Sequence, residues 1–289
     1  MLLQQLINGL TLGVIYSLLA LGYSLVFGTL GFINFAHGAV AMIAPYVAWY
    51  GFARMGMPFL PSCLMGVVFA GIVGVFMDLV GYKPIRTSSR LAMITVSVGF
   101  LYIVKTGLQI IFGADPFQFA AGKIVIYNFG NTTFNSVDVW VLVLSVILMI
   151  CLQLFTRYTK AGRGLRAISL DRDTASLMGV NVNSTISLTF FIGSALGGIS
   201  AIMMSMYFSQ FDLAMTGPIG DKAFAAVVLG GVGSIPGAMV GGVLMGILES
   251  FAGTFLNAQA SQGVAFVVLI LILIFRPSGL LGEKEVVRD

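Results

Sequence analysis

The segment LINGLTLGVIYSLLALGYSLVF (6–27) decides the class of fold, because it contains no charged residue. An α-helix of about 20 apolar residues is long enough to cross a hydrocarbon core about 30 Å thick. The segment is longer than the apolar core of a signal peptide, which has roughly 7–15 residues. No charged residue precedes it either. We therefore expect a retained first membrane span.

Similar apolar segments recur along the chain. Of its 289 residues, 58% are hydrophobic and 9% are charged, against roughly 25% charged in a soluble domain. This composition excludes a soluble fold and predicts an all-α, polytopic transmembrane helical bundle of about 8–9 spans, which forms one domain over residues 1–289. The expected spans lie at about 6–27, 33–53, 60–80, 91–112, 138–157, 184–208, 221–256 and 261–276.

One or two of these helices are expected to be interrupted. The segment 221–256 is too long for one ordinary span, and GGVGSIPG (230–237) brings four glycines and a proline into its middle. It either crosses once at a steep tilt or enters and returns as two short helices. An earlier interruption, GFINFAHGA (31–39), shares its first Gly and its final Gly-Ala with GGVGSIPGA (230–238). Interrupted helices at matching positions in two halves of a chain point to a transport pathway.

The distribution of basic residues predicts the topology. Loops 81–90 and 157–172 and the tail from Arg276 are basic and should lie in the cytoplasm, whereas the loops near 54–59 and 113–137 should lie outside. The segment 221–256 must then return to the side it left, which favours two short helices and an external N terminus. This topology explains the net charge of +4 better than a nucleic-acid partner does.

The outer loop 113–137 contains KIVIYNFGNTTFNS (123–136), in which two β-prone runs flank Asn-Phe-Gly-Asn. This pattern favours a small hairpin. The loop is either a solvated connection or a docking surface for an external partner.

Glycines recur four residues apart, a spacing that lets helices approach closely in lipid. We expect tight helix packing at these pairs: Gly9 and Gly13, Gly193 and Gly197, Gly237 and Gly241, Gly242 and Gly246.

Motifs for catalysis are missing from the sequence. It has no GxxxxGK[ST] phosphate loop, no zinc-ligand spacing, no CxxC and no GxSxG. The one histidine, His37, has no carboxylate near it in sequence to orient it as a base. Cys63 and Cys151 each lie in an apolar segment, so we expect no disulfide between them. We expect neither an enzyme nor a bound metal or cofactor.

Few ionisable residues lie within the expected spans. Asp78 lies beside Lys83 near the cytoplasmic end of its span, and Lys105 can extend to water. Asp221 is a weaker candidate for an intramembrane site. Glu249 is central, and a structural hydrogen bond explains it better than ion binding. Energy from another subunit is therefore favoured over coupling to an ion gradient.

The polar stretch TKAGRGLRAISLDRDTASLMGVNVN (159–183) predicts a short helix over Arg172–Met178, with Asp171 as N-cap and Gly179 just beyond its end. So short a helix is marginal alone in water. Its apolar residues are too few for binding to a membrane surface, so we expect it to dock into a protein.

Within this stretch, RAISLDRDTASLMGVNV (166–182) resembles the cytoplasmic loop of ABC-importer permeases. Asp173, Ala175 and Gly179 match the acidic-x-Ala-x-x-x-Gly core of their coupling motif, although the trailing I-x-L-P is absent. GFINFAHGA (31–39) and three further motifs extend the resemblance to the LivH-type permeases of bacterial high-affinity branched-chain amino acid importers, from the first span to the end of the chain. These three are NGLTLGVIYSLLALGYSLVFG (8–28), DKAFAAVVLGGVGSIPGAMVGG (221–242) and RPSGLLG (276–282).

The resemblance implies a type II-like ABC permease in the bacterial inner membrane. Its implied partners are a LivM-type permease or a second copy of the chain, two cytoplasmic ATPases that bind ATP-Mg, and a periplasmic amino acid binding protein. The loop 158–183 would be the cytoplasmic coupling loop that meets an ATPase. Its expected coupling residues are Arg166, Asp171, Asp173, Ala175, Met178 and Gly179.

The expected substrates are leucine, isoleucine and valine, which are zwitterions with an apolar side chain. Polar backbone at membrane depth can face their charged groups. The candidate pathway residues are Asn34, His37, Gly38, Gly231, Gly233 and Ser234, although all six could serve helix packing alone. Import of urea or a short amide is the alternative within this class. An ion-coupled carrier, a passive channel and a scaffold without transport are the alternatives outside it.

Overall fold

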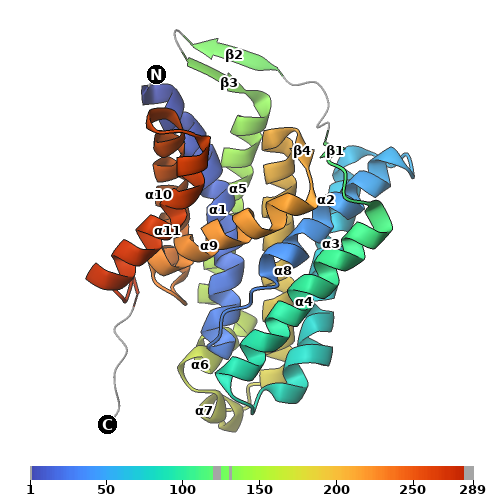
Figure 1. Ribbon diagram of the computed structural model, residues 1–289. Coiled ribbons are helices and arrows are strands. Elements are labelled where there is room, and N and C mark those ends of the chain that lie inside the picture. The colour runs from blue at the N-terminus through green and yellow to red at the C-terminus, as the bar shows by residue number, and fades with distance from the viewer. Residues whose placement is uncertain (1, 120–124, 130–131, 283–289) are drawn as a thin grey trace.

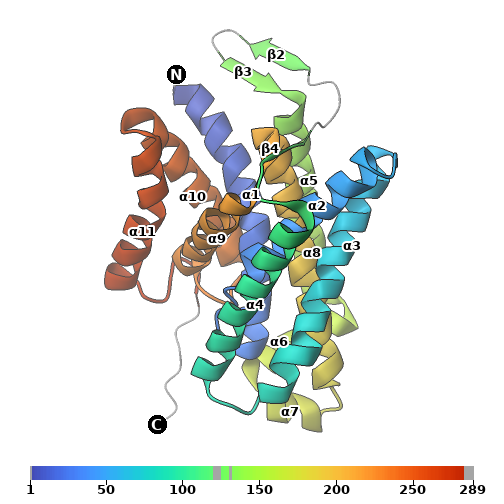
Figure 2. The same cartoon turned by 45° about the vertical axis from the view of Figure 1, so that its right-hand side comes forward.

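The structure is a computed structural model that describes residues 2–119, 125–129 and 132–282. The described part is a bundle of helices with four short strands (Figures 1 and 2). The α-helices are α1 (Leu2–Leu30), α2 (His37–Ala53), α3 (Phe59–Met77), α4 (Arg90–Phe112), α5 (Ser136–Tyr158), α6 (Lys160–Leu170), α7 (Arg172–Leu177), α8 (Val182–Phe208), α9 (Thr216–Gly230), α10 (Ile235–Phe255) and α11 (Ala258–Phe275). A π-helix (Asp78–Tyr82) and a 3-10 turn (Lys83–Ile85) follow α3, and a second 3-10 turn (Leu213–Met215) precedes α9.

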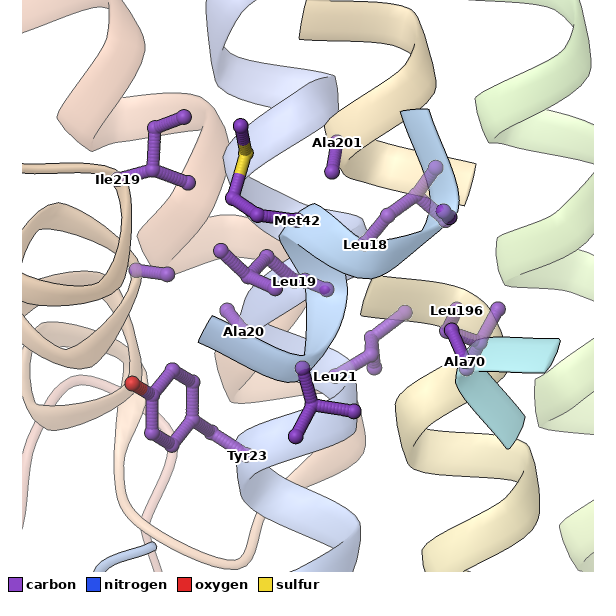
Figure 3. Close-up of a cluster of buried hydrophobic side chains, with 14 of the residues drawn as sticks. Leu18, Leu19, Ala20, Leu21, Tyr23, Met42, Ala70, Leu196, Ala201 and Ile219 are labelled. Carbon is purple, nitrogen blue, oxygen red and sulfur yellow. The ribbon is translucent and has the colours of Figure 1, made fainter. Parts of the chain in front are cut away.

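Helix α1 is the centre of the bundle. Its most apolar window is 89% buried, because α5, α8, α9 and α10 pack around it. Figure 3 shows Leu18, Leu19, Ala20 and Leu21 on successive positions of α1, with Met42, Ala70, Leu196, Ala201 and Ile219 of the surrounding helices nearby. The segment that decided the fold class is therefore an interior helix.

The paired glycines bring α1 and α10 into backbone contact. A Cβ atom at Gly13 would lie 2.7 Å from the Cα of Val243, and one at Gly9 would lie 2.8 Å from the Cα of Ile247. In return, Gly246 of α10 faces the backbone of Gly13. The predicted role of the glycine spacing in tight packing is confirmed here.

Six of the described helices are long and apolar enough to cross a membrane: α1, α3 with its π-helical extension, α4, α5, α8 and α10. The 17-residue α2 and the 15-residue α9 are shorter. The multi-pass helical fold is confirmed.

The long segment 221–256 is two helices. Helix α9 ends at Gly230 and α10 begins at Ile235, with positive φ angles of 111° at Gly231 and 84° at Gly233. An L side chain adopts such angles only with strain, so these glycines permit the turn. Figure 1 shows α10 rising to the end of the molecule where the N terminus lies, before α11 descends. The predicted break into two helices is confirmed, but α10 is not short, because its 21 residues are enough to cross a membrane.

The two ends of the bundle differ in character. Strands β2 (Ile126–Phe129) and β3 (Thr132–Asn135) pair antiparallel beside the N terminus, in the loop where the sequence favours a small hairpin (Figure 1). Strand β1 (Phe117–Gln118) pairs with β4 (Gln210–Phe211). Helices α6 and α7 lie at the opposite end (Figure 2).

Candidate functional site

Helix α7 forms at the polar loop with both ends defined as the sequence predicts. The Asp171 side chain accepts hydrogen bonds from the backbone N–H of Asp173 (2.9 Å) and of Thr174 (3.0 Å). Gly179 has a φ of 86°, and the N–H of Val180 bonds back to the carbonyl of Ala175 at 3.0 Å. These bonds satisfy backbone groups that a short helix leaves open at its ends.

The predicted coupling residues divide between the surface and the interior. Ala175 is 3% exposed and packs inward, whereas Met178 is 81% exposed, as are Leu177 (88%) and Leu170 (84%). Asp171, Asp173 and Gly179 are also exposed. Arg166 donates to the carbonyl of Thr156 near the end of α5. Leu170, Leu177 and Met178 are hereafter the apolar knob.

Arg172 was missed by the sequence reasoning, although it joins α7 to the body of the protein. Its Nε and Nη2 donate to the carbonyl oxygen of Thr29, at 2.9 Å and 2.6 Å. Thr29 lies in the last turn of α1, where carbonyls have no partner within the helix. Partial burial, with the nearby charge of Arg86, lowers the pKa of the Arg172 guanidinium. Nothing in the local sequence reveals a partner so far away along the chain.

Asp78, expected to be interfacial, is fully buried. It forms an ion pair with Arg86 and accepts a hydrogen bond from the Ser187 hydroxyl at 2.6 Å. Arg86 also donates to the Asn183 side chain at 2.6 Å. This cluster ties the turn after α3 to the start of α8, beside α7.

The first interruption is tightly enclosed. The Asn34 side-chain oxygen accepts from the Tyr82 hydroxyl at 2.9 Å, and the His37 ring lies 4.5 Å from the ring of Tyr23. Asn34 is 3% exposed and His37 is 1% exposed. A Cβ atom at Gly38 would lie 3.1 Å from the Cα of Gly220 on α9. The chain packs α2 directly against the first half of α9 here.

The second interruption packs against the C-terminal segment instead. The N–H of Leu280 donates to the carbonyl of Leu229 (2.9 Å), and Ser234 caps α10 by accepting from the N–H of Gly237 (3.1 Å). Gly231 and Gly233 form the turn between the two helices.

The structure places the two interruptions at opposite ends of α9. Gly38 contacts Gly220, while Gly231 follows the last residue of the helix. Eleven helical residues rise about 16 Å. The six candidate pathway residues therefore form two separate groups in this chain.

Glu249 has a structural partner, in agreement with the role that the sequence favours. Its carboxylate accepts from Lys222 Nζ at 2.5 Å and from the Tyr16 hydroxyl at 2.9 Å. The Lys222 and Glu249 side chains are each 12% exposed. The sequence reasoning missed Lys222, which lies on α9. This ion pair fastens α9 to α10 and α1.

Close glycine contacts between helices, an ion pair inside the bundle and six helices long enough to cross a membrane are features of a multi-pass membrane protein. The family model described as "Branched-chain amino acid transport system / permease component" matches residues 5–273. The chain belongs to this family, and it is a permease component of an ABC importer.

Known proteins resemble the chain over nearly its whole length. The high-affinity branched-chain amino acid transport system permease protein BraD of Pseudomonas aeruginosa is 37% identical, covering 98% of this chain and 97% of the relative. The high-affinity branched-chain amino acid transport system permease protein LivH of Escherichia coli (strain K12) is 35% identical, covering 98% of this chain and 96% of the relative. A solved structure, PsaBC from Streptococcus pneumoniae in complex with Fab, has a TM-score of 0.52 at 15% identity, covering 94% of this chain and 91% of that one. The last likeness concerns the fold alone.

Proposed function

We propose that this chain is the translocation-pore subunit of an ATP-driven importer for leucine, isoleucine and valine in the bacterial inner membrane. The substrate class is that in the names of relatives 35–37% identical to it. The fold we propose is type II-like with about 8–9 spans, counting α2, the α9–α10 pair and α11.

The observation that carries the proposal is the apolar knob, whose residues lie at the end of α6 and at the end of α7. Its three side chains are all more than 80% exposed at the end of the bundle where the basic loops lie. Exposed apolar groups on a polar loop are typical of a surface that docks into a protein. The partner that this knob fits is a cytoplasmic ATPase, which binds ATP-Mg and supplies the work, so this chain needs neither a cofactor nor catalysis of its own.

Arg172 connects α7 to the membrane-spanning helix α1, so that movement of α7 can reach the membrane helices. Its bidentate contact holds the end of α1, and the first interruption begins two residues beyond Thr29. Movement of α7 in an ATPase groove therefore pulls on the chain that leads to Asn34 and His37.

The remaining partners complete the assembly. A LivM-type permease or a second copy of this chain forms the other half of the pore. A periplasmic amino acid binding protein delivers substrate at the hairpin end, and the six candidate residues of the two interruptions belong to the pathway.

The test is reconstitution of the chain with its partner subunits in vesicles. We expect ATP-dependent leucine uptake that requires the binding protein. Uptake of urea instead of leucine would replace the substrate assignment. Accumulation of leucine by the isolated chain under a proton or sodium gradient would overturn the ATP-driven mechanism.

A further inference from the structure

Asp221 is an exposed carboxylate on the first half of α9. In the described part of the chain it has neither a hydrogen bond nor an ion pair. Its neighbour Lys222 points elsewhere, to Glu249 on α10, because consecutive helical residues diverge by about 100°. The charge of Asp221 is therefore uncompensated by any described side chain.

The depth of Asp221 follows from its neighbours on α1. Lys222 and Glu249 meet the hydroxyl of Tyr16, which is the middle residue of the 29-residue α1 and lies about 21 Å from each end. A Cβ atom at Gly220 would lie 3.4 Å from the hydroxyl oxygen of Tyr23. Asp221 thus lies level with the central turns of α1, near the middle of the bilayer.

The open face around Asp221 is confined to the start of α9. Gly217 and Pro218, one turn earlier, are exposed, whereas every residue over 225–230 is buried. Figure 1 shows α9 crossing the front of the bundle with no helix drawn in front of it.

Apolar rings lie beside the carboxylate. Phe224 follows Asp221 by one helical turn, and its ring centroid is 6.4 Å from that of Phe35, which is 39% exposed. The open face thus combines a negative charge with an aromatic pair, of which Phe224 belongs to α9 and Phe35 to the turn before α2.

Contact of this face with lipid would be energetically unfavourable. A carboxylate at the bilayer centre is costly, and such residues face water-filled cavities, charged partners or substrates. A charged ligand needs an opposite charge, and an aliphatic group needs an apolar surface out of water. A ligand with an ammonium group next to a branched aliphatic chain satisfies both.

We infer that Asp221 binds the ammonium group of the transported amino acid, while Phe35 and Phe224 contact its aliphatic side chain. This inference rests on the proposed function, and it assigns to the pathway a fixed charge that the sequence reasoning did not require. It places the substrate at the junction of α2 and α9, where Gly38 meets Gly220.

The first experiment measures leucine uptake by the full complex carrying Asp221→Asn. We expect uptake to fall at least about tenfold, as for the loss of one charge-assisted hydrogen bond. Asp221→Glu keeps the carboxylate and should restore part of the uptake. Glu285→Gln removes a carboxylate from the C-terminal tail, 64 positions along the chain from Asp221, and should leave uptake unchanged.

Each result of this experiment bears on one idea. Wild-type uptake of leucine with equal uptake by Asp221→Asn would overturn the inference and leave the proposed function standing. Failure of the wild-type complex to import leucine would overturn the proposed function itself. Loss of the second permease from purified Asp221→Asn complexes would show that Asp221 pairs with a cation of that subunit, which also overturns the inference.

The second experiment asks whether Asp221 faces water. In a chain with Cys63 and Cys151 changed to Ser, Gly217→Cys places a thiol one helical turn before Asp221 on the same open face and keeps the carboxylate. This cysteine should react with a charged, membrane-impermeant thiol reagent during turnover, and saturating leucine should slow the reaction. Ile147→Cys, in the middle of α5 and 49% exposed, is the matched control and should stay unreactive. Equal inertness of the two cysteines would refute a substrate-facing carboxylate.

Discussion

Replacing Arg172 by Ala should uncouple ATP hydrolysis from transport. The change removes two hydrogen bonds from a charged donor to the Thr29 carbonyl, at 2.9 Å and 2.6 Å. A hydrogen bond to a charged group contributes about 1.5–3 kcal/mol. Both bonds run from one half-buried side chain to a single carbonyl acceptor, so we take about 2 kcal/mol for the pair, or roughly a 30-fold shift in the docking of α7 on α1.

The assay compares leucine imported per ATP hydrolysed in reconstituted complexes. We expect this ratio to fall about tenfold or more in Arg172→Ala, within the shift worked out above. Arg172→Lys keeps the charge but loses the fork of donors, so it should give an intermediate ratio. Arg163→Ala is the matched control, because Arg163 is an exposed residue of the same loop with one weak contact, to the Tyr158 carbonyl at 3.4 Å.

An unchanged ratio of leucine to ATP in Arg172→Ala would refute the reasoning. It would show that movement of α7 reaches the membrane helices without the bond to α1.

Three further substitutions test other contacts. Gly13→Ala should lower the melting temperature of the purified complex, because the new Cβ meets the backbone of α10, whereas Gly28→Ala has nothing within 4 Å and should not. Lys222→Met leaves Glu249 buried without its cation, so we expect a loss of about 3 kcal/mol in unfolding experiments, largely restored by the double change Lys222→Met with Glu249→Leu. Gly179→Val forces a β-branched residue to a φ of 86° with no steric contact, at a cost of about 1–2 kcal/mol; ligand-stimulated ATPase activity should fall more than in Gly179→Asn, since Asn tolerates this conformation.

The helices and their packing could be read from local patterns. Apolar runs predicted long helices, and glycine spacing predicted close packing at Gly9 and Gly13, because both patterns lie within one or two helical turns. That α10 is the helix packed there could not be predicted from the spacing. The caps of α7 were equally local, since Asp171 and Gly179 act on the backbone beside them.

The ion pairs and the anchor of α7 could not be read in this way. Arg172 and Thr29 lie 143 positions apart, and Lys222 and Glu249 lie 27 apart, so only the fold brings them together. The similarity between the two interruptions suggested that they lie together in one pathway. The structure separates them by most of the length of α9, and the sequence pattern did not predict where that helix begins.

The backbone contact between α1 and α10 limits where the protein can change shape. Gly9 and Gly13 meet α10 with no layer of side chains between the two helices that could slide or swap rotamers. These two helices should move together as one rigid body during the transport cycle. Changes in helix packing within the chain should instead occur at less buried helices such as α4 and α5, whose apolar windows are only 17% and 28% buried.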